Sequence, residues 1–411
     1  MTLIRPFRGL RPVPEKAADV VAPPYDVLNT SEARQRAEGR PWSFLHISKP
    51  EIDLPDGTDP YTDEVYQTGA ANLQRMIDAG ILVRDEQDSY YVYQLVMGEH
   101  VQTGIVAVAS VAAYDANRIK KHEFTRPDKE QDRVRQIDAL NAQTGPVFLT
   151  YRHQQEVERL ISAVTAGTPD FDLVADDGVR HVLWPVSEPE KVSAITAAFE
   201  RMPALYIADG HHRSAAASRV AAMRNTAGQT PEAAHNYFLA VIFSDRQMRI
   251  LDYNRVVKDL NGLSPAAFMQ RLQPAFTVTP SDRPVKPDAA GVFGMYLDGR
   301  WYRLVIADTL RNASDPVKRL DVSLLADNLI EPVLGISDPR RDQRIDFVGG
   351  IRGLEELEKR VDSGEMQVAF SLYPTSLEEL MAVADNDEVM PPKSTWFEPK
   401  LADGLVSHLL D

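Results

Sequence analysis

A run of five polar residues near the middle of the chain has the side chains needed to hold phosphate. Asp209, Gly210, His211, His212 and Arg213 follow an apolar, strand-like segment and precede an alanine-rich segment that favours a helix. Glycine lets an anion approach the backbone, and the first N–H groups of a helix can bind that anion. Arg213 can bind two phosphate oxygens at once. The run therefore predicts a phosphate-binding turn; the alternative is that Asp209 only caps the helix and that both histidines are structural.

A second polar segment, residues 120–125, places a carboxylate beside cations. Glu123 lies in a predicted loop, where a carboxylate can act as a general base toward a hydroxyl, and His122 precedes it. Arg126 and Arg133 belong to a basic patch that follows in this acidic protein and suits an anionic substrate. Because acidic residues alternate with these arginines, a solvated helix face is the alternative interpretation of the patch.

Two segments that contain paired prolines carry further polar side chains. Lys393, Ser394 and Thr395 follow prolines that fix an extended path, and all three can donate to an anion such as the phosphate of a nucleotide. The aromatic residues after them suit either an adenine ring or a core. Near the start of the chain, paired prolines precede Tyr25 and Asp26. That pattern predicts a rigid turn, which serves either as a structural corner or as a contact to the substrate.

The elements that must position these side chains predict a mixed α/β (α+β) protein. Apolar residues alternate with polar ones in several strand-like segments and recur at helical spacing in others. Residues 90–113 and 236–257 are each expected to form a hairpin. The predicted organisation is an N-terminal α/β region, a catalytic core with the His-Glu and D-G-H-H-R motifs, and a C-terminal α/β region, over residues 1–115, 116–235 and 236–411. A boundary between two lobes is expected near residue 235.

The composition excludes several classes of protein. Of the 411 residues, 44% are hydrophobic and 26% are charged, which is ordinary for a globular protein. The formal net charge of -15 disfavours nucleic-acid binding, which depends on clustered cations. A chain without cysteine has no disulfide, thiolate metal site or cysteine nucleophile. No apolar run has the length of a membrane span, so a soluble, cytoplasmic protein is expected. Neither a P-loop nor a Rossmann glycine motif is present.

Several segments together resemble a known family. APPYDV, KKHEFT, ADGHHR, YNRVV and MPPKSTWFEPK, in this order over nearly the whole chain, are similar to a prokaryotic family catalogued as a domain of unknown function, number 1015. ADGHHR also resembles the D-G-H-H-R motif of archaeal free serine kinases, whose ParB/sulfiredoxin-like fold binds nucleotide phosphates at a strand–turn–helix. The pair His122-Glu123 resembles their P-H-E segment, with Lys121 where they have proline. The resemblance implies a ParB/sulfiredoxin-like nucleotide-binding core with additional N-terminal and C-terminal regions.

The resemblance further implies a kinase that transfers a phosphoryl group from ATP or ADP to free L-serine or a similar metabolite. Glu123 resembles the base that takes the hydroxyl proton, and Asp209 resembles the acidic residue near Mg²⁺; the four residues after Asp209 resemble the loop that holds the donor phosphates. Mg²⁺ needs only one or two carboxylates besides phosphate oxygens. Asp209 is therefore the expected Mg²⁺ ligand with Glu123 as a second candidate, and His122 completes the expected catalytic set.

Two other functions use the same residues. A metal-dependent hydrolase or phosphatase would bind Zn²⁺, Mn²⁺ or iron through imidazole and carboxylate side chains, those of His122, Asp209, His211 and His212. A nucleotide-binding regulator would use the same module without chemistry. The expected partners are a small-molecule substrate and a nucleotide, with no nucleic acid and no membrane, and a homodimer is left open.

Overall fold

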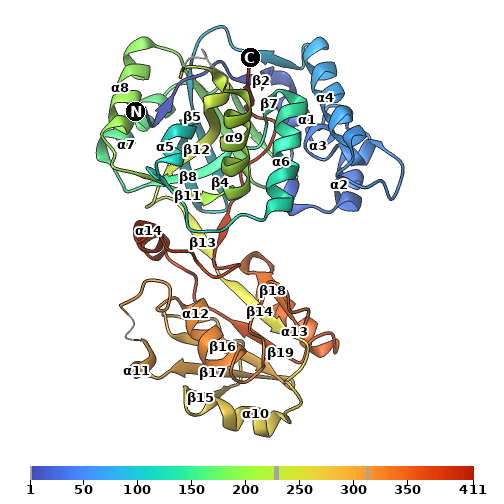
Figure 1. Ribbon diagram of the computed structural model, residues 1–411, viewed down its shortest axis with the longest axis vertical. Helices are drawn as coiled ribbons and strands as arrows, with labels where there is room; N and C mark the ends of the chain where they lie inside the picture. Colours follow the sequence, from blue (N-terminus) through green and yellow to red (C-terminus); the bar gives the residue numbers. More distant parts are fainter. Residues whose placement is uncertain (1, 226–230, 312–313) are drawn as a thin grey trace. The chain divides into compact units, whose positions relative to one another are not determined.

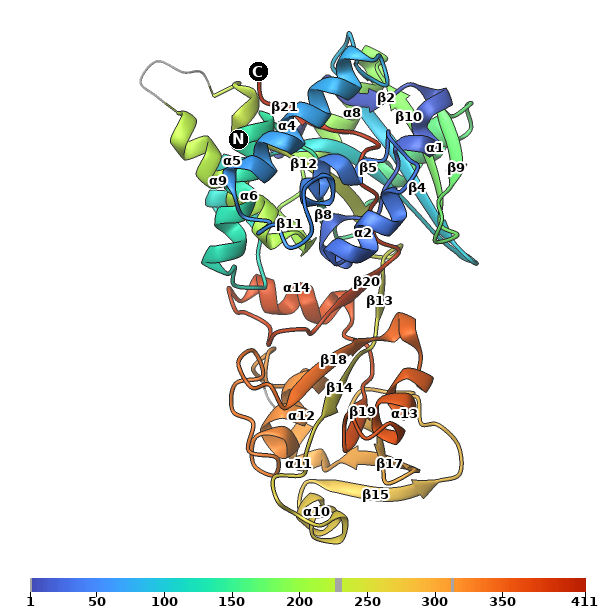
Figure 2. The same ribbon diagram turned by 90° about the vertical axis from the view of Figure 1, so that its right-hand side faces the viewer.

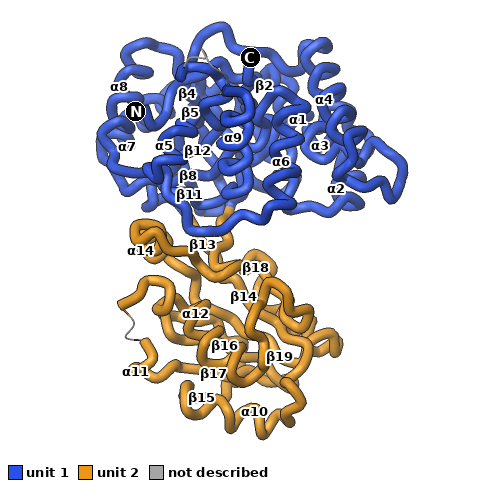
Figure 3. Tube along the Cα trace, in the orientation of Figure 1, with its two compact units in different colours: residues 1–248, 399–411 blue, residues 249–398 orange. Residues whose placement is uncertain are grey.

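The computed structural model describes residues 2–225, 231–311 and 314–411. The described residues divide into two compact units, of which unit 1 comprises residues 1–248 and 399–411 and unit 2 comprises residues 249–398 (Figure 3). Unit 1 is therefore built from both ends of the chain. Among the described residues, no helix combines the length and the hydrophobicity needed to cross a membrane.

The division at residue 248 differs from the boundaries expected at residues 115 and 235, and strand pairing gives the reason. Strand β5 (His100–Ser110), from the first expected region, pairs with β12 (Tyr237–Ser244), which follows the second expected boundary. A backbone ladder of this length holds both segments in one unit.

The two expected hairpins have different outcomes. The hairpin over residues 90–113 is confirmed, because β4 (Tyr90–Met97) pairs with β5 across a tight turn. The hairpin over residues 236–257 does not form. Strand β12 pairs within unit 1, whereas β14 (Tyr253–Val257) pairs within unit 2.

Unit 1 contains a mixed β-sheet. Its strands lie in the order β6 (Ile119–Lys120), β11 (Leu205–Asp209), β8 (Val147–Tyr151), β12, β5, β4, β10 (Arg180–Val186) and β9 (Phe171–Val174), and β1 (Ile4–Arg5) also pairs with β5. Strand β11 is parallel to β6 and β12 is parallel to β8. The other neighbouring pairs are antiparallel. The predicted mixed α/β class is confirmed.

Helices α5 (Val111–Asp115), α7 (Gln155–Thr165), α8 (Pro189–Glu200) and α9 (His211–Arg224) share one apolar core with the strands of this sheet. Helix α9 contributes alanines to that core, which confirms the predicted alanine-rich helix. Helix α6 (Pro127–Leu140) lies beside α9 (Figures 1 and 2), and apolar side chains of both pack together. The loop before α6 is thereby held near the first turn of α9.

The N-terminal part of unit 1 forms a second apolar core of its own. Its elements are β2 (Leu10–Pro12), η1 (Pro14–Lys16), α1 (Ala17–Val20), η2 (Tyr25–Val27), α2 (Thr30–Ala37), α3 (Leu45–Ser48), η3 (Pro50–Asp53), α4 (Asp63–Asp78) and β3 (Leu82–Arg84). Three short elements complete the described part of the unit: η4 (Ala234–Asn236), and β7 (Ala142–Gln143), which pairs with β21 (His408–Leu409). The last pair joins the C-terminal segment to this unit.

Unit 2 contains an antiparallel sheet. Its strands lie in the order β15 (Phe276–Ser281), β17 (Arg300–Ile306), β16 (Val292–Leu297), β19 (Val368–Ser371), β14 and β18 (Ile345–Gly349). Strands β13 (Arg249–Leu251) and β20 (Trp396–Glu398) form a separate pair. The helical elements are α10 (Pro265–Leu272), α11 (Asp308–Arg311), α12 (Asp321–Leu325), η5 (Ala326–Ile330), η6 (Gly350–Arg352), α13 (Glu355–Asp362) and α14 (Leu377–Asp385).

Candidate active site

The turn between β11 and α9 carries the D-G-H-H-R run, as the sequence predicts. Strand β11 ends at Asp209, and α9 begins at His211. Gly210 joins them with φ +97°, a left-handed conformation that side chains with a Cβ rarely adopt. A Cβ at this position would also lie 3.3 Å from the Cα of Val147. The backbone N–H of Gly210 donates to Oδ1 of Asp209 at 2.7 Å, which fixes the carboxylate against the turn.

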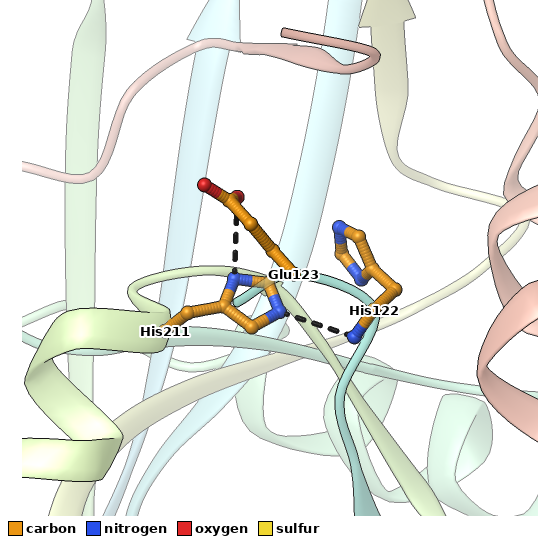
Figure 4. A group of neighbouring side chains, drawn as sticks. All are labelled: His122, Glu123 and His211. Carbon is orange, nitrogen blue, oxygen red and sulfur yellow. Dashed lines mark hydrogen bonds and ion pairs between the residues drawn. The ribbon is translucent and has the colours of Figure 1, made fainter. Parts of the chain in front are cut away.

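The His-Glu pair lies at the same edge of the sheet. It follows β6, which runs parallel to β11, so both segments leave the sheet at the carboxyl ends of neighbouring strands. The backbone N–H of His122 donates to Nε2 of His211 at 3.4 Å, and Oε2 of Glu123 lies 3.7 Å from Nδ1 of His211 (Figure 4). The rings of the two histidines meet edge to face, with 4.5 Å between their centroids. Parallel pairing thus brings together motifs that are far apart in the sequence.

Burial keeps both imidazoles of this cluster neutral. Burial lowers the pKa of His122 to about 4. The pKa of His211 is held well below its usual range, mainly by burial and secondly by the neighbouring His122. A neutral imidazole can accept a proton or bind a metal ion. One ligand atom from each of His122, Glu123 and His211 lies within 4.8 Å of the others, so this cluster could hold a metal ion.

Asp209 is surrounded by cations on the other side of the turn. Its Oδ2 lies 3.5 Å from Nζ of Lys400, and its Oδ1 lies 3.9 Å from a terminal nitrogen of Arg213. Burial acts to raise the pKa of Asp209, but Lys400 and Arg213 outweigh it and hold that pKa below its usual range. Asp209 is therefore an ionised carboxylate at neutral pH, which is the form that can bind a divalent cation.

His212 has a different neighbour from His211. Its Nε2 accepts a hydrogen bond of 3.0 Å from the backbone N–H of Arg126. Among the described residues, the group that could hold a metal ion consists of His122, Glu123 and His211, and His212 is not part of it. The side chain of Arg126 is exposed and bonds to Asp128 at 2.8 Å. The structure therefore joins His212 and Arg126 to each other rather than to the imidazole cluster.

The predicted substrate residues Tyr25, Asp26 and Arg133 lie together around Arg213. The guanidinium of Arg133 lies 3.9 Å from the centroid of the Tyr25 ring. A terminal nitrogen of Arg213 lies 3.7 Å from Oδ2 of Asp26. Arg133 also binds the carboxylate of Asp132 at 2.7 Å. Arg213 therefore contacts both the turn and the residues predicted for the substrate.

The residues predicted to bind a nucleotide near the C-terminus belong to unit 2. The carbonyl of Lys393 accepts a hydrogen bond of 3.0 Å from Arg255, and the carbonyl of Ser394 accepts one of 2.9 Å from Thr375. The hydroxyl of Ser394 donates to the carbonyl of Pro391 at 2.6 Å. These contacts, within unit 2, order the loop that also contains Thr395. A role for Lys393, Ser394 and Thr395 at a nucleotide stays a prediction.

Sequence reasoning did not select Lys400 and Asp403. The structure places Lys400 beside Asp209 and places Asp403 near Arg213, on the same cavity. Lys400 belongs to the segment MPPKSTWFEPK, so its sequence position already drew attention to it. Asp403 had a weaker signal: Ala402-Asp403-Gly404 repeats the Ala-Asp-Gly of the turn between β11 and α9, and Gly404 also has a positive φ of +90°. Both residues reach the turn and the cavity because residues 399–411 return to unit 1.

This chain is similar to one protein family and, at low sequence identity, to several solved structures. A model of the family described as "Protein of unknown function (DUF1015)" matches residues 4–323. Free serine kinase in complex with AMP has 13% sequence identity and a TM-score of 0.35, over 71% of this chain and 86% of that chain. SbnI with a C-terminal truncation from Staphylococcus aureus has 12% identity and a TM-score of 0.40, over 74% and 87%. A comparison with curated proteins gives no match.

Proposed function

The chain belongs to the DUF1015 family, whose function is unknown, and we propose that it is a small-molecule kinase. It would transfer a phosphoryl group from ATP or ADP to the hydroxyl of free L-serine or a similar metabolite. The observation that carries the proposal is the meeting of the D-G-H-H-R turn with the His-Glu pair, through the contacts of His211 with His122 and Glu123. Phosphoryl transfer needs positioned charge and a base more than covalent help, and this arrangement supplies both.

The turn suits the donor phosphates. The helix N-terminus at His211 and the close approach allowed by Gly210 offer backbone N–H groups, and Arg213 offers a planar guanidinium. Lys400, which lies beside Asp209, adds a further cation at this place. His212 belongs to the same first turn of α9 and completes the proposed phosphate loop.

Glu123 is proposed as the general base. Its side chain is half exposed, so that a substrate hydroxyl can reach it. In the proposed step the hydroxyl oxygen forms a bond to the terminal phosphorus of the nucleotide, the bond from that phosphorus to the bridging oxygen breaks, and Glu123 takes the hydroxyl proton. The products are the phosphate ester and the nucleotide shortened by one phosphate. His122 and His211, neutral and buried, would hold Glu123 in position.

The carboxylates present fit a magnesium ion. Asp209 is ionised and partly exposed, and Glu123 is half exposed; one or two such carboxylates suffice when phosphate oxygens supply the remaining ligands. Bound there, Mg²⁺ would neutralise charge on the transferred phosphoryl group. Asp209 is the proposed principal ligand.

The test is a reaction of the whole chain with Mg²⁺, L-serine and either ATP or ADP, followed by phosphorus NMR. We expect an O-phosphoserine resonance, and we expect Glu123→Gln to reduce kcat by about 10²–10⁴-fold while nucleotide binding persists. Glu99→Gln is the matched control, because Glu99 is an exposed glutamate in the turn between β4 and β5. Full activity in Glu123→Gln would refute the assignment of the base, and the absence of phosphoserine with both nucleotides would refute the serine kinase.

The imidazole cluster favours one other function, a metal-dependent hydrolase or phosphatase. Two imidazoles and a carboxylate within 4.8 Å suit Zn²⁺, Mn²⁺ or iron better than Mg²⁺. Metal analysis of the purified protein separates the two functions. Stoichiometric transition metal that is lost in His211→Ala, together with no phosphoserine formation, would favour the hydrolase.

A further inference from the structure

A small cavity of about 30 Å³, lined by both apolar and polar side chains, lies in unit 1 and touches the β11–α9 turn through Arg213. Its lining comes from segments far apart in the sequence and includes Tyr25, Ser48, Arg133, Gly145, Arg213 and Asp403. By volume the cavity holds about two water molecules or a group of similar size. It is therefore large enough for the head group of a small molecule.

Two buried polar atoms in the wall of this cavity have no hydrogen-bond partner among the described residues. They are Oδ1 of Asp403 and the hydroxyl oxygen of Ser48, in side chains whose residues are 2% and 5% exposed. Buried polar atoms in folded proteins are nearly always hydrogen-bonded, because an unsatisfied one costs about 1–3 kcal/mol. Both atoms border the same cavity, which points to a polar occupant.

The charges around the cavity favour an anion. Arg133 and Arg213 both line it, and a guanidinium matches the two oxygens of a carboxylate. Two nitrogens of Arg133 donate to Asp132, so its remaining terminal nitrogen is the one that can donate to a ligand. The contacts of Arg213 with Asp26 and Asp209 are 3.7 and 3.9 Å long, which is beyond the length of a charge-assisted hydrogen bond. The guanidinium of Arg213 is thus attracted to both carboxylates without being hydrogen-bonded to either, and one of its terminal nitrogens donates to the backbone carbonyl of Pro146.

The backbone next to the cavity is shaped for close approach. A Cβ on Gly145 would lie 3.4 Å from Cδ of Arg213 and 3.7 Å from Oδ1 of Asp403. Those are ordinary contact distances, so alanine fits at position 145 without moving its neighbours. Its methyl group would, however, occupy space between the two side chains that face the cavity.

We propose that this cavity binds the carboxylate of the acceptor substrate, so that the acceptor is a hydroxylated carboxylic acid or amino acid and not a simple alcohol. Arg133 and Arg213 donate to the two carboxylate oxygens, and the protonated carboxyl of Asp403 donates a third hydrogen bond. The inference rests on the proposed kinase function, which leaves the class of acceptor open. Because Arg213 also borders the donor turn, one side chain then connects the acceptor to the phosphates.

The surroundings of Asp403 support its role as a donor. Burial is the main influence and raises the pKa of Asp403 to about 7, against the opposing effect of Arg213; Asp26 raises this pKa further, and Arg133 and the backbone of Tyr25 lower it. Below pH 7 the carboxyl is therefore protonated and able to donate. Above pH 7 its negative charge would repel a bound carboxylate.

The first experiment compares ligands by isothermal titration of the whole chain at pH 6.5. L-serine is compared with serinol (2-amino-1,3-propanediol), which replaces the carboxylate by a neutral hydroxymethyl group, and with D-glycerate and acetate. We expect serinol to bind at least about tenfold more weakly than L-serine, the loss typical of a hydrogen bond to a charged group. Equal binding of serinol and L-serine, or no binding of any carboxylate, would overturn the proposal and leave only ordered water in the cavity.

Binding and turnover separate the two proposals. Carboxylate-dependent binding without phosphoserine formation would refute the kinase and keep the carboxylate site. Phosphoserine formation with equal affinity for serinol would refute the carboxylate site and keep the kinase.

The second experiment uses variants. Gly145→Ala is expected to weaken L-serine binding about tenfold with an unchanged Tm, because the added methyl group narrows the cavity without strain. Arg135→Gln, on the same helix as Arg133 but bonded to Asp63, is the control and should bind L-serine normally. Unchanged affinity in Gly145→Ala would overturn the proposal even if an Arg133→Gln variant failed to fold.

Asp403→Asn tests the proton. The amide keeps a donor and cannot ionise, so L-serine affinity should stay constant between pH 6 and pH 9. In the unaltered chain the affinity should fall about tenfold per pH unit above the pKa of Asp403. Parallel pH profiles in both proteins would overturn the role of Asp403.

Discussion

Asp403 in unit 1 and Asp321 in unit 2 are both buried aspartates whose pKa burial raises to about 7, yet they have different surroundings. Both oxygens of Asp321 accept from the backbone N–H of Gly291, at 2.8 and 3.0 Å. Oδ1 of Asp403 has no partner among the described residues and borders a cavity with two arginines. The carboxyl of Asp321 thus holds the loop at Gly291 against the start of α12, whereas Oδ1 of Asp403 is available to a ligand.

The buried arginines of the two units differ in the same way. In unit 2 the guanidinium of Arg255 donates to the carbonyls of Tyr253 and Lys393, and burial lowers the pKa of Arg255 to about 10. In unit 1, burial acts to lower the pKa of Arg213, but Asp26 and Asp209 outweigh it and raise that pKa. Arg213 also donates to a backbone carbonyl, that of Pro146. Unlike Arg255, however, it faces two carboxylates and borders a cavity, and such surroundings are suited to binding a ligand. Burial and a shifted pKa do not separate the two cases, and the identity of the partners does.

The largest expected effect comes from exchanging the two arginines for lysine. Arg213→Lys should reduce kcat by about 10²–10³-fold, since an ammonium cannot reproduce the planar contact to phosphate oxygens. Arg255→Lys should leave kcat nearly unchanged and lower the free energy of unfolding by about 1–3 kcal/mol, because it loses hydrogen bonds to buried carbonyls. Steady-state kinetics and urea unfolding of both variants provide the measurement. A comparable loss of activity in Arg255→Lys would contradict the contrast between the units.

An intermediate effect is expected on the pH dependence of stability. A carboxyl with a raised pKa in the folded state costs stability as pH rises from about 4, the pKa in the unfolded chain, to about 7, and by at most about 4 kcal/mol. Asp403→Asn should therefore lose less stability between pH 5 and pH 8 than the unaltered chain. Asp321→Asn removes the same pH-dependent cost, but it also replaces one oxygen that accepts from the Gly291 N–H by an NH₂ donor. Its free energy of unfolding should therefore rise by about 1 kcal/mol less than that of Asp403→Asn.

Urea unfolding at both pH values checks this prediction. The charged groups that act on Asp403 are Arg213, Asp26 and Arg133, and those that act on Asp321 are Glu379 and Arg311. Identical pH profiles for both variants and the unaltered chain would show that neither aspartate has a raised pKa.

The smallest expected effect is on ADP binding. It concerns Lys393 and Lys400, which belong to the segment MPPKSTWFEPK but lie in unit 2 and unit 1, respectively. Lys400→Ala should weaken ADP binding by up to about fivefold, the limit for a partly exposed ion pair, because Lys400 lies beside Asp209 at the turn. Lys393→Ala is the comparison, because the side chain of Lys393 is exposed in unit 2. Titration with ADP in the presence of Mg²⁺ distinguishes them. An effect of Lys400→Ala alone would confine the nucleotide site to unit 1.

Local sequence was sufficient to predict the strand–turn–helix geometry of the turn between β11 and α9. Gly210 follows an apolar strand and precedes a run of alanines, and the positive φ, the strand end and the helix start all follow from these neighbours. The hairpin over residues 90–113 was predictable for the same reason, since its two strands are adjacent in the chain. Where the partner strand was distant, prediction from alternation was wrong: residues 236–257 have the pattern of a hairpin, but their strands pair in different sheets.

The residue types, the turn and the mixed α/β class were thus determined by the sequence itself, because they depend on neighbours along the chain. Only the tertiary structure decided which of these residues meet. Glu123 reaches His211 because β6 pairs in parallel with β11, and Asp403 reaches the cavity beside Arg213 because the C-terminal segment returns to unit 1. Such contacts depend on strand pairing and burial between distant segments, and no spacing within a motif records that pairing.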